Sequence, residues 1–378
     1  MRMKKVLILA AVAAIAATAC NKTYEVNPTP GVPIGFGSWT EHLTKARVQG
    51  SNTFAADDNF NVYGYKLVGE NKTTVFNGDV VSTTDGTNWT YTTPRYWDPN
   101  ATSYTFFAVS PAGLLNSADA KTGAFTSNDI TFAGDNNDIL VADKTTVNKT
   151  DGSGNFNNFG TVHMVFNHVA SLVDINVKKA PALHNATVKV TALALENVVT
   201  KGTMAVSADY NRATTASPAG TNGPVVSWTP GTTKGTYGPT NGVSSVTIPD
   251  GGQEITEDNT FPGSAEDYSP AGSTILINHL VVMPQTFDTG KNETASQKLT
   301  ITYKISVENG GENTYTGSVW LADFDKIDDT DQADTKVASW EPGKHYVLYL
   351  TLNANAITFD ASINDWATTT NGYHYLIQ

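Results

Sequence analysis

The 378-residue sequence lacks most of the features that would assign it to a common functional class. It has a single cysteine, Cys20, so no disulfide can form within the chain and its stability must come from packing. Its net charge is −12 and no Lys/Arg cluster follows the first few residues, which argues against binding of nucleic acid. Neither a nucleophile-elbow motif nor a phosphate-binding glycine loop is present, and the seven histidines show no metal-ligand spacing. We therefore expect a protein that is not an enzyme and has no cofactor or metal.

Apolar residues at helical spacing are also missing from any long stretch after residue 20. Alternation with a period of two is clear instead, and turn residues separate the alternating runs. The clearest runs are 60–65, 104–109 and 299–305, and others are 162–166, 170–177, 186–195, 246–248, 275–283, 314–321 and 345–352. The sequence therefore predicts an all-β protein.

The chain is long enough for about two domains of ordinary size. A polar stretch at 144–160 has little to bury and predicts a boundary between residues 48–150 and residues 151–378. The spacing of the strands suggests antiparallel β-sandwiches, and isolated barrels remain an alternative. The Thr-, Gly- and Pro-rich region 213–242 is expected to be a long loop with one short strand.

The first twenty residues have the pattern of a secretion signal. Arg2, Lys4 and Lys5 precede an apolar run at 6–17 that is too short to span a bilayer. Small residues then lead to Cys20, as in the lipobox of a bacterial lipoprotein. We expect residues 1–20 to be a lipoprotein signal peptide with Cys20 as the lipidated residue. The alternative is an ordinary secretory signal followed by a free cysteine.

A series of aromatic residues carries a family resemblance. Trp89 and Tyr91 are followed by Tyr96 and Trp97, and then by an alternating aromatic strand that ends in proline at 104–111. Further matching segments follow at 138–142, 165–168, 282–285, 340–346, 357–359 and 365–366. In its order and spacing the series resembles the fimbrillin family, the type V pilins of Gram-negative, Bacteroidetes-type bacteria. The resemblance implies two transthyretin-like antiparallel β-sandwich domains in tandem. The four named aromatics are interpreted as core, and a glycan-stacking surface is the alternative.

The same resemblance implies a function for residues 21–47. Prolines at 28, 30 and 33 predict an extended tether, and Ile34 and Phe36 alternate with glycines as in a strand. In fimbrillins an arginine-specific protease cuts in a loop after the first strand, and Arg47 matches that position, which would make Val48 the new N-terminus. The alternative for Arg47 is an exposed loop charge without biological meaning.

In such pilins, loss of the first strand opens a groove that a strand of a neighbouring subunit fills. The alternating C-terminal tail, about 356–378, is the donor candidate, and the alternative is an edge strand of the second domain. The donor-strand candidates are Ile357, Phe359, Ala361, Ile363, Tyr373, Tyr375 and Ile377.

The resemblance thus implies a structural subunit of a cell-surface fimbria that supports adhesion and biofilm formation. Its expected partners are other pilus subunits, in a homopolymer, and an arginine-specific protease, with host or bacterial surface receptors as further candidates. The precursor is expected to be anchored in the outer membrane by its lipid, and the mature form is expected in the extracellular fimbria. Alternatives are a permanently anchored glycan-binding lipoprotein and a fimbrial tip or anchor subunit. The acidic segment 323–334 is interpreted as a solvated loop, with a weak cation site as the alternative.

Overall fold

The structure is a computed structural model of the whole chain. It describes residues 32–37, 54, 56–134, 138–149, 161–211, 223–239, 248–255, 274–326, 336–354 and 357–365. Nearly all regular structure in these residues is β. Two short 3₁₀ turns, η1 (Pro181–Leu183) and η3 (Leu321–Asp323), interrupt the strands. None of the described segments forms a helix long and apolar enough to cross a membrane. The all-β prediction is confirmed.

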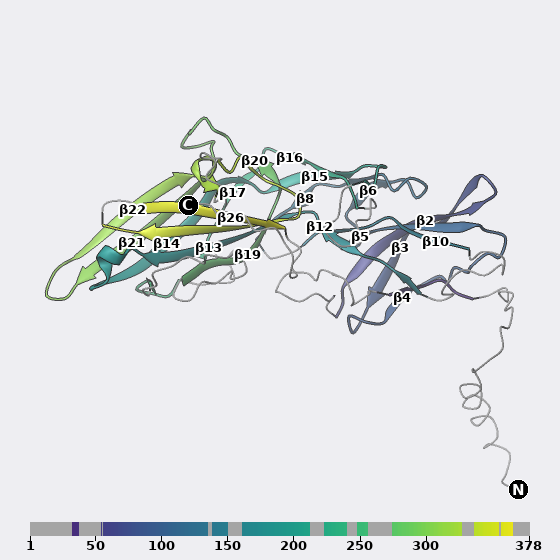
Figure 1. Cartoon of the computed structure of the whole chain (residues 1–378), viewed down its shortest axis with the longest axis horizontal. Coiled ribbons are helices and arrows are strands. Elements are labelled where there is room, and N and C mark those ends of the chain that lie inside the picture. The colour runs from purple at the N-terminus through teal and green to yellow at the C-terminus, as the bar shows by residue number, and fades with distance from the viewer. Residues whose placement is uncertain are drawn as a thin grey trace, which may run out of the picture.

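Two groups of strands follow one another along an elongated molecule (Figure 1). The N-terminal group forms a sheet in the order β12-β9-β5-β2-β3-β4, with β10 also pairing with β5. Its strands are β2 (Asn59–Val68), β3 (Asn71–Thr83), β4 (Trp89–Tyr91), β5 (Ser103–Ser110), β9 (Leu140–Ala142), β10 (Thr145–Asn148) and β12 (Phe166–His168). The short strands β1 (Gly35–Gly37) and β11 (Thr161–His163) form a separate pair. A core rich in phenylalanine lies between them and the sheet.

The C-terminal group has two larger sheets, in the orders β19-β13-β25-β26-β23 and β17-β14-β21-β22, with β18 also pairing with β14. The strands of the first are β13 (Ser171–Lys179), β19 (Thr274–Val282), β23 (Asp325–Lys326), β25 (Lys344–Leu352) and β26 (Ile357–Asp365). Those of the second are β14 (Ala186–Val199), β17 (Lys234–Tyr237), β18 (Gln253–Ile255), β21 (Lys298–Val307) and β22 (Glu312–Trp320). The strands β20 (Gln285–Thr286) and β24 (Ser339–Trp340) form a two-stranded pair. Both larger sheets contribute buried aliphatic side chains to one core.

A further sheet, here called the joining sheet, combines strands from the two groups in the order β16-β15-β7-β6, with β8 pairing with β15. Its strands are β6 (Leu115–Ala118), β7 (Phe125–Ser127), β8 (Ile130–Thr131), β15 (Lys201–Val206) and β16 (Val226–Pro230). In its register Ala205 lies opposite Thr126, and Gly202 lies opposite Ile130. A third core contains residues from the joining sheet and from both groups, including Phe107, Met204 and Met283. The two groups are therefore connected by hydrogen-bonded strands as well as by the chain.

The strand predictions are confirmed where alternation was strongest, because one face of each strand packs on a core. Residues 60–65, 104–109 and 299–305 lie in β2, β5 and β21, and most of the weaker runs are strands as well. Region 213–242 differs, since its described part holds two strands, β16 and β17, instead of one. Their Thr- and Gly-rich sequences hid them, because edge strands with few buried residues carry a weak apolar signal.

Most strand pairs are antiparallel, as predicted, but β1–β11, β13–β25 and β23–β26 are parallel. In the longest of these pairs Leu172 lies opposite His345, so the partners are far apart in the sequence and no hairpin dictates their direction.

Candidate functional site

The first strand lies in a slot between β11 and the turn that follows β4. On one side β1 pairs with β11 in parallel, with Phe36 opposite Val162. On the other side the Ile34 N–H donates to the carbonyl of Arg95 at 2.7 Å, and the Trp97 N–H donates to the carbonyl of Val32 at 3.1 Å. The strand is therefore hydrogen-bonded along both edges, although it is very short.

Apolar burial holds this strand in its groove. Ile34 is 0% exposed and Phe36 is 6% exposed. Four aromatic rings surround the Phe36 ring in edge-to-face geometry, with centroid separations from 5.3 to 6.2 Å. They belong to Phe60, Phe76, Tyr91 and Phe106. Such pairs contribute about 0.5–1.5 kcal/mol each beyond their buried area, so Phe36 is the main anchor of the strand.

One wall of the groove is held by polar contacts of its own. The Tyr91 hydroxyl donates to the carbonyl of Ile34 at 2.6 Å, and it accepts the Arg95 N–H at 3.1 Å. Burial raises the pKa of Tyr91, which keeps the hydroxyl protonated as a donor. The Arg95 guanidinium contacts the Asp79 carboxylate and the Val75 carbonyl, each at 3.1 Å. The last two contacts do not involve the first strand, so this wall can persist without it.

The glycine after Phe36 lets the strand approach β11 closely. A Cβ atom on Gly37 would lie 2.7 Å from Cγ2 of Thr161, and the Gly37 carbonyl accepts the Met164 N–H at 3.3 Å. The alternation of Ile34 and Phe36 with glycine predicted this strand from the sequence. Its partners, β11 and the turn at Arg95, were not predicted, because neither pairing is local in the chain.

The aromatic series contributes to the N-terminal core, as expected, with one exception. Trp97 is 4% exposed, and Trp89 and Tyr91 pack against the core. Tyr96 is 52% exposed, so its assignment to the core is wrong. Its backbone lies in an extended bridge with Pro33, and neighbouring residues of extended chain point to opposite faces.

Four donor-strand candidates lie in β26, whose nine residues all pair with β25. Their partners in that register are residues of the C-terminal core. In chain order, Ile357, Phe359, Ala361 and Ile363 lie opposite Leu352, Leu350, Leu348 and Tyr346. Cys20, Arg47, Val48, Tyr373, Tyr375 and Ile377 lie outside the described residues, as does most of the acidic segment 323–334. From that segment, the Asp323 carboxylate pairs with the Lys291 ammonium at 2.9 Å.

Two buried aspartate–histidine pairs, which the sequence did not predict, lie outside the groove. His345 Nε2 lies 2.8 Å from one carboxylate oxygen of Asp174. The other carboxylate oxygen accepts a hydrogen bond from the backbone N–H of His279. Burial raises the pKa of Asp174, but the two histidines outweigh this effect and hold the pKa below 3.8. The pKa of His279 is lowered by burial. The second pair joins His168 to Asp138, which is 0% exposed. Among the described residues, no group of three or more potential ligands is placed to hold a metal ion.

Comparisons with known proteins agree with the resemblance found in the sequence. A profile of the family described as Fimbrillin-like matches residues 44–366. No curated protein matches the chain. Among solved structures, a fimbrial protein from Bacteroides vulgatus is 16% identical, with a TM-score of 0.48 and coverage of 90% of this chain and 100% of that chain. A fimbrilin from Porphyromonas gingivalis is 11% identical, with a TM-score of 0.39 and coverage of 90% of this chain and 98% of that chain. Because the profile matches most of its length, the chain belongs to the fimbrillin-like family.

Proposed function

We propose that this protein is a structural subunit of a cell-surface fimbria that polymerises by strand exchange and supports adhesion and biofilm formation. Family membership supports the fimbrial role. The observation that carries the mechanism is the burial of Phe36, in a very short strand, and of Ile34 just before it, in a groove whose walls belong to other parts of the chain.

The proposed maturation begins with export as a lipoprotein attached through Cys20. Cleavage after Arg47 then leaves Val48 as the N-terminus. It separates the first strand from the rest of the chain, so that only noncovalent contacts hold Phe36 in its pocket. A cut at this site would therefore turn an internal strand into a replaceable ligand of the groove.

The groove sets two requirements for the incoming strand. It must run parallel to β11, and it must present apolar side chains two residues apart where Ile34 and Phe36 now lie. Because β26 is paired along its whole length with β25, the remainder of the tail, 366–378, is the better donor. It carries Tyr373, Tyr375 and Ile377 at this spacing.

We propose that the architecture is two transthyretin-like sandwiches in tandem, with the boundary moved from residue 150, where the sequence predicted it, to about Val169. Strand pairing supports this later division. The reason is that β11 and β12 follow residue 150 but pack with the N-terminal strands, β12 pairing with β9.

The proposal places the lipidated precursor in the outer membrane and the mature subunit in the extracellular fimbria. Its partners are further copies of this chain or other pilus subunits, and an arginine-specific protease. Adhesion receptors on host or bacterial surfaces would contact the assembled fimbria.

The test compares three full-length proteins after treatment with an arginine-specific protease: the natural chain, Arg47→Ala, and Lys45→Ala as a matched control that removes a neighbouring charge. Mass spectrometry should find an N-terminus at Val48, and electron microscopy should show fibres, for the natural chain and for Lys45→Ala. Arg47→Ala should give neither.

A synthetic peptide of residues 31–40 should inhibit fibre growth, because it refills the groove, and the same peptide with Phe36→Ala should inhibit far less. Fibres from the Arg47→Ala protein would contradict the proposed cleavage site. Retention of only the lipidated, uncut form in cells would favour the alternative of a permanently anchored lipoprotein.

A further inference from the structure

The strand β22 forms a long, nearly uncharged edge of the C-terminal half. It is nine residues long, and among the described residues its only strand partner is β21. Figure 1 shows β21 and β22 as a hairpin that reaches the end of the molecule opposite the N-terminal strands. An edge strand presents unpaired backbone N–H and C=O groups that can pair with another strand.

Protective features that usually block such an edge are missing from β22. Natural edge strands carry lysine, proline or bulges. The only charged residue of β22 is Glu312, at its start, and no residue after it is charged or is proline. Its pairing with β21 contains no bulge: the register is unbroken from Trp320 opposite Lys298 to Glu312 opposite Ser306. The other nine-residue strand at a sheet edge, β19, differs, because its residues Leu276 and Asn278 have further polar partners. Backbone pairing with a further strand is therefore open to β22.

The sequence of β22 is complementary to itself in the antiparallel direction. Its central residue is Thr316, so a two-fold axis there would pair all nine residues and keep each side chain on its own face. On the outer face, where Thr314, Thr316 and Ser318 are exposed, Thr316 would meet its own copy and Thr314 would meet Ser318. Such hydroxyl pairs are favourable cross-strand neighbours. On the inner face, Tyr315 would lie opposite Gly317.

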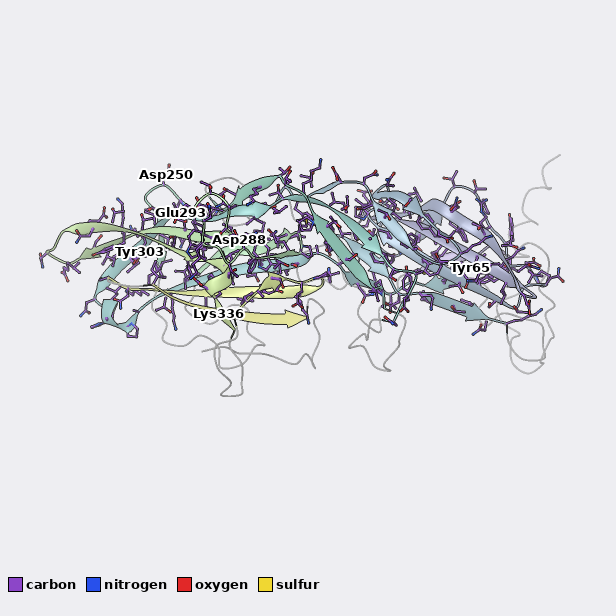
Figure 2. The ribbon with its side chains drawn as sticks, turned by 90° about the horizontal axis from the view of Figure 1, so that it is seen from above. Tyr65, Asp250, Asp288, Glu293, Tyr303 and Lys336 are labelled. Carbon is purple, nitrogen blue, oxygen red and sulfur yellow. The ribbon has the colours of Figure 1, made fainter. Side chains whose placement is uncertain are left out.

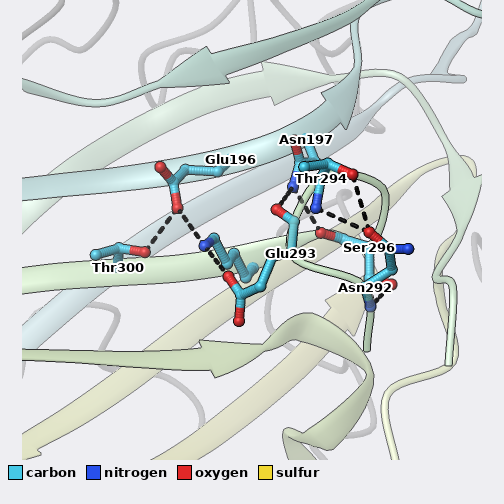
Figure 3. Close-up of polar contacts among 8 residues, drawn as sticks. Glu196, Asn197, Asn292, Glu293, Thr294, Ser296 and Thr300 are labelled. Carbon is cyan, nitrogen blue, oxygen red and sulfur yellow. Dashed lines mark hydrogen bonds and ion pairs between the residues drawn. The ribbon is translucent and has the colours of Figure 1, made fainter. Parts of the chain in front are cut away.

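At the two ends of β22 the charged groups already have partners in their own chain, since Glu312 pairs with Lys304 at 2.7 Å. Glu312 of one copy would lie opposite Trp320 of the other, and the Lys298 ammonium lies 5.8 Å from the centroid of that indole ring. Lys298 contacts Glu196 at 3.4 Å and Glu293 at 2.6 Å, so its side chain is already held in this position. Figure 3 shows these two glutamates with the contacts that their carboxylates make. No like charges would lie directly opposite each other. A peptide of unrelated sequence would lack the matched hydroxyl pairs about Thr316, so a second copy is the better partner.

We infer that β22 is a lateral interaction surface that pairs antiparallel with β22 of a second copy of this chain, extending the β17-β14-β21-β22 sheet across the two molecules. This contact does not use the first-strand groove. It therefore stands apart from strand exchange and would associate subunits side by side.

The first test maps the register with introduced cysteines in the full chain carrying Cys20→Ser and Arg47→Ala. The second change keeps the first strand in place, so that strand exchange cannot produce dimers. Opposite residues of an antiparallel pair have Cα atoms about 4.5–5.5 Å apart, within the range for a disulfide. Under mild oxidation, Thr316→Cys should form covalent dimers by itself, whereas Thr314→Cys and Ser318→Cys should do so efficiently only when mixed.

The matched control is Thr302→Cys. Thr302 lies opposite Thr316 on β21, with their hydroxyls 3.0 Å apart, but β22 separates it from the second copy. It should not form dimers. Equal dimer formation by Thr302→Cys, or none by Thr316→Cys, would overturn the inference.

The second test uses charge in the same Arg47→Ala background. Thr316→Lys places two ammonium groups opposite each other and should raise the dimer dissociation constant, measured by analytical ultracentrifugation, about tenfold or more. Thr302→Lys should change it much less. Mixing Thr316→Lys with Thr316→Asp should restore association. A dimer whose dissociation constant does not respond to Thr316→Lys would refute the β22 interface, and so would a protein that stays monomeric throughout. Neither result would bear on strand exchange.

Discussion

Replacing Phe36 with alanine separates the contribution of the first strand to stability from that of the rest of the N-terminal half. The ring is 6% exposed and is surrounded by four other rings. Phe-to-Ala changes in cores cost about 3–5 kcal/mol, the larger values where the site cannot collapse. Collapse is restricted here, because Phe60, Phe76 and Phe106 are fixed on neighbouring strands of one sheet. We therefore expect a loss in the upper part of this range, about 4 kcal/mol.

Two measurements on the uncut chain report this loss. In urea unfolding, followed by tryptophan fluorescence, the N-terminal transition, to which buried Trp97 contributes, should move to lower denaturant. In hydrogen exchange, the Ile34 amide, which donates to the Arg95 carbonyl, should lose most of its protection. Val80→Ala is the matched control, because Val80 lies in the same half but is 50% exposed, and its effect should stay within about 0.5 kcal/mol. If Phe36→Ala costs less than about 1 kcal/mol, the first strand is not an integral part of the core and the argument for a replaceable strand fails.

Three further predictions concern other contacts. Tyr91→Phe removes the hydroxyl that donates to the Ile34 carbonyl at 2.6 Å, which should destabilise the first strand by about 0.5–1.5 kcal/mol and increase exchange at its amides. Stability should fall on acidification in two pH ranges, because burial lowers the folded-state pKa values of His279 and His163, whose contributions are lost as the pH falls below about 6.5, and the two histidines beside Asp174 lower its pKa, so that its contribution is lost as the pH falls below about 3.8. His279→Asn, which keeps a residue tolerant of its positive φ of 57°, should make the loss of stability near pH 6.5 smaller in pH-dependent urea titrations, and a loss of unchanged size would contradict the assignment. Gly202→Ala would place a Cβ atom 2.6 Å from a β16 carbonyl oxygen and should lower the free energy of unfolding by about 1–3 kcal/mol. The melting temperature should therefore fall, and an unchanged melting temperature would show that the joining sheet adjusts to the extra atom without strain.

Local patterns in the sequence predicted individual strands better than their partners. In β21 the buried residues Leu299, Ile301, Tyr303 and Ile305 alternate with less buried ones, which is the pattern of a strand with one face on a core. Figure 2 shows Tyr303 in the C-terminal half and Tyr65 in the N-terminal half, at positions where alternation identified strands β21 and β2. The β-sheet content and the first strand could therefore be derived before the structure was known.

Pairing between distant segments could not be derived in this way. β13 is buried on both faces, so its sequence gives no register, and it pairs in parallel with β25 through residues far away in the chain. The groove has the same limitation. Phe36 predicts that a pocket exists, but Phe60, Phe76 and Phe106 become its lining only after three sheet strands are in register. Tyr96 shows the same limitation within a sequence motif. Adjacent residues of an extended segment point to opposite faces, and the motif does not tell which of the two adjacent aromatics, Tyr96 or Trp97, faces the core.

The joining sheet has a consequence for the order in which the protein can fold during synthesis. Its strand β8 ends at Thr131, but its partner β15 begins only at Lys201 and ends at Val206. At about 5–20 residues per second, the ribosome needs roughly 4–15 s to make the intervening segment. During this interval Phe125, Ile130 and Phe132, which are all buried in the finished protein, have no partners from β15. The N-terminal half cannot complete its fold first. The core around Phe36 uses residues up to Phe166 only, so it can form early, and the joining sheet is the part of the fold that waits for β15.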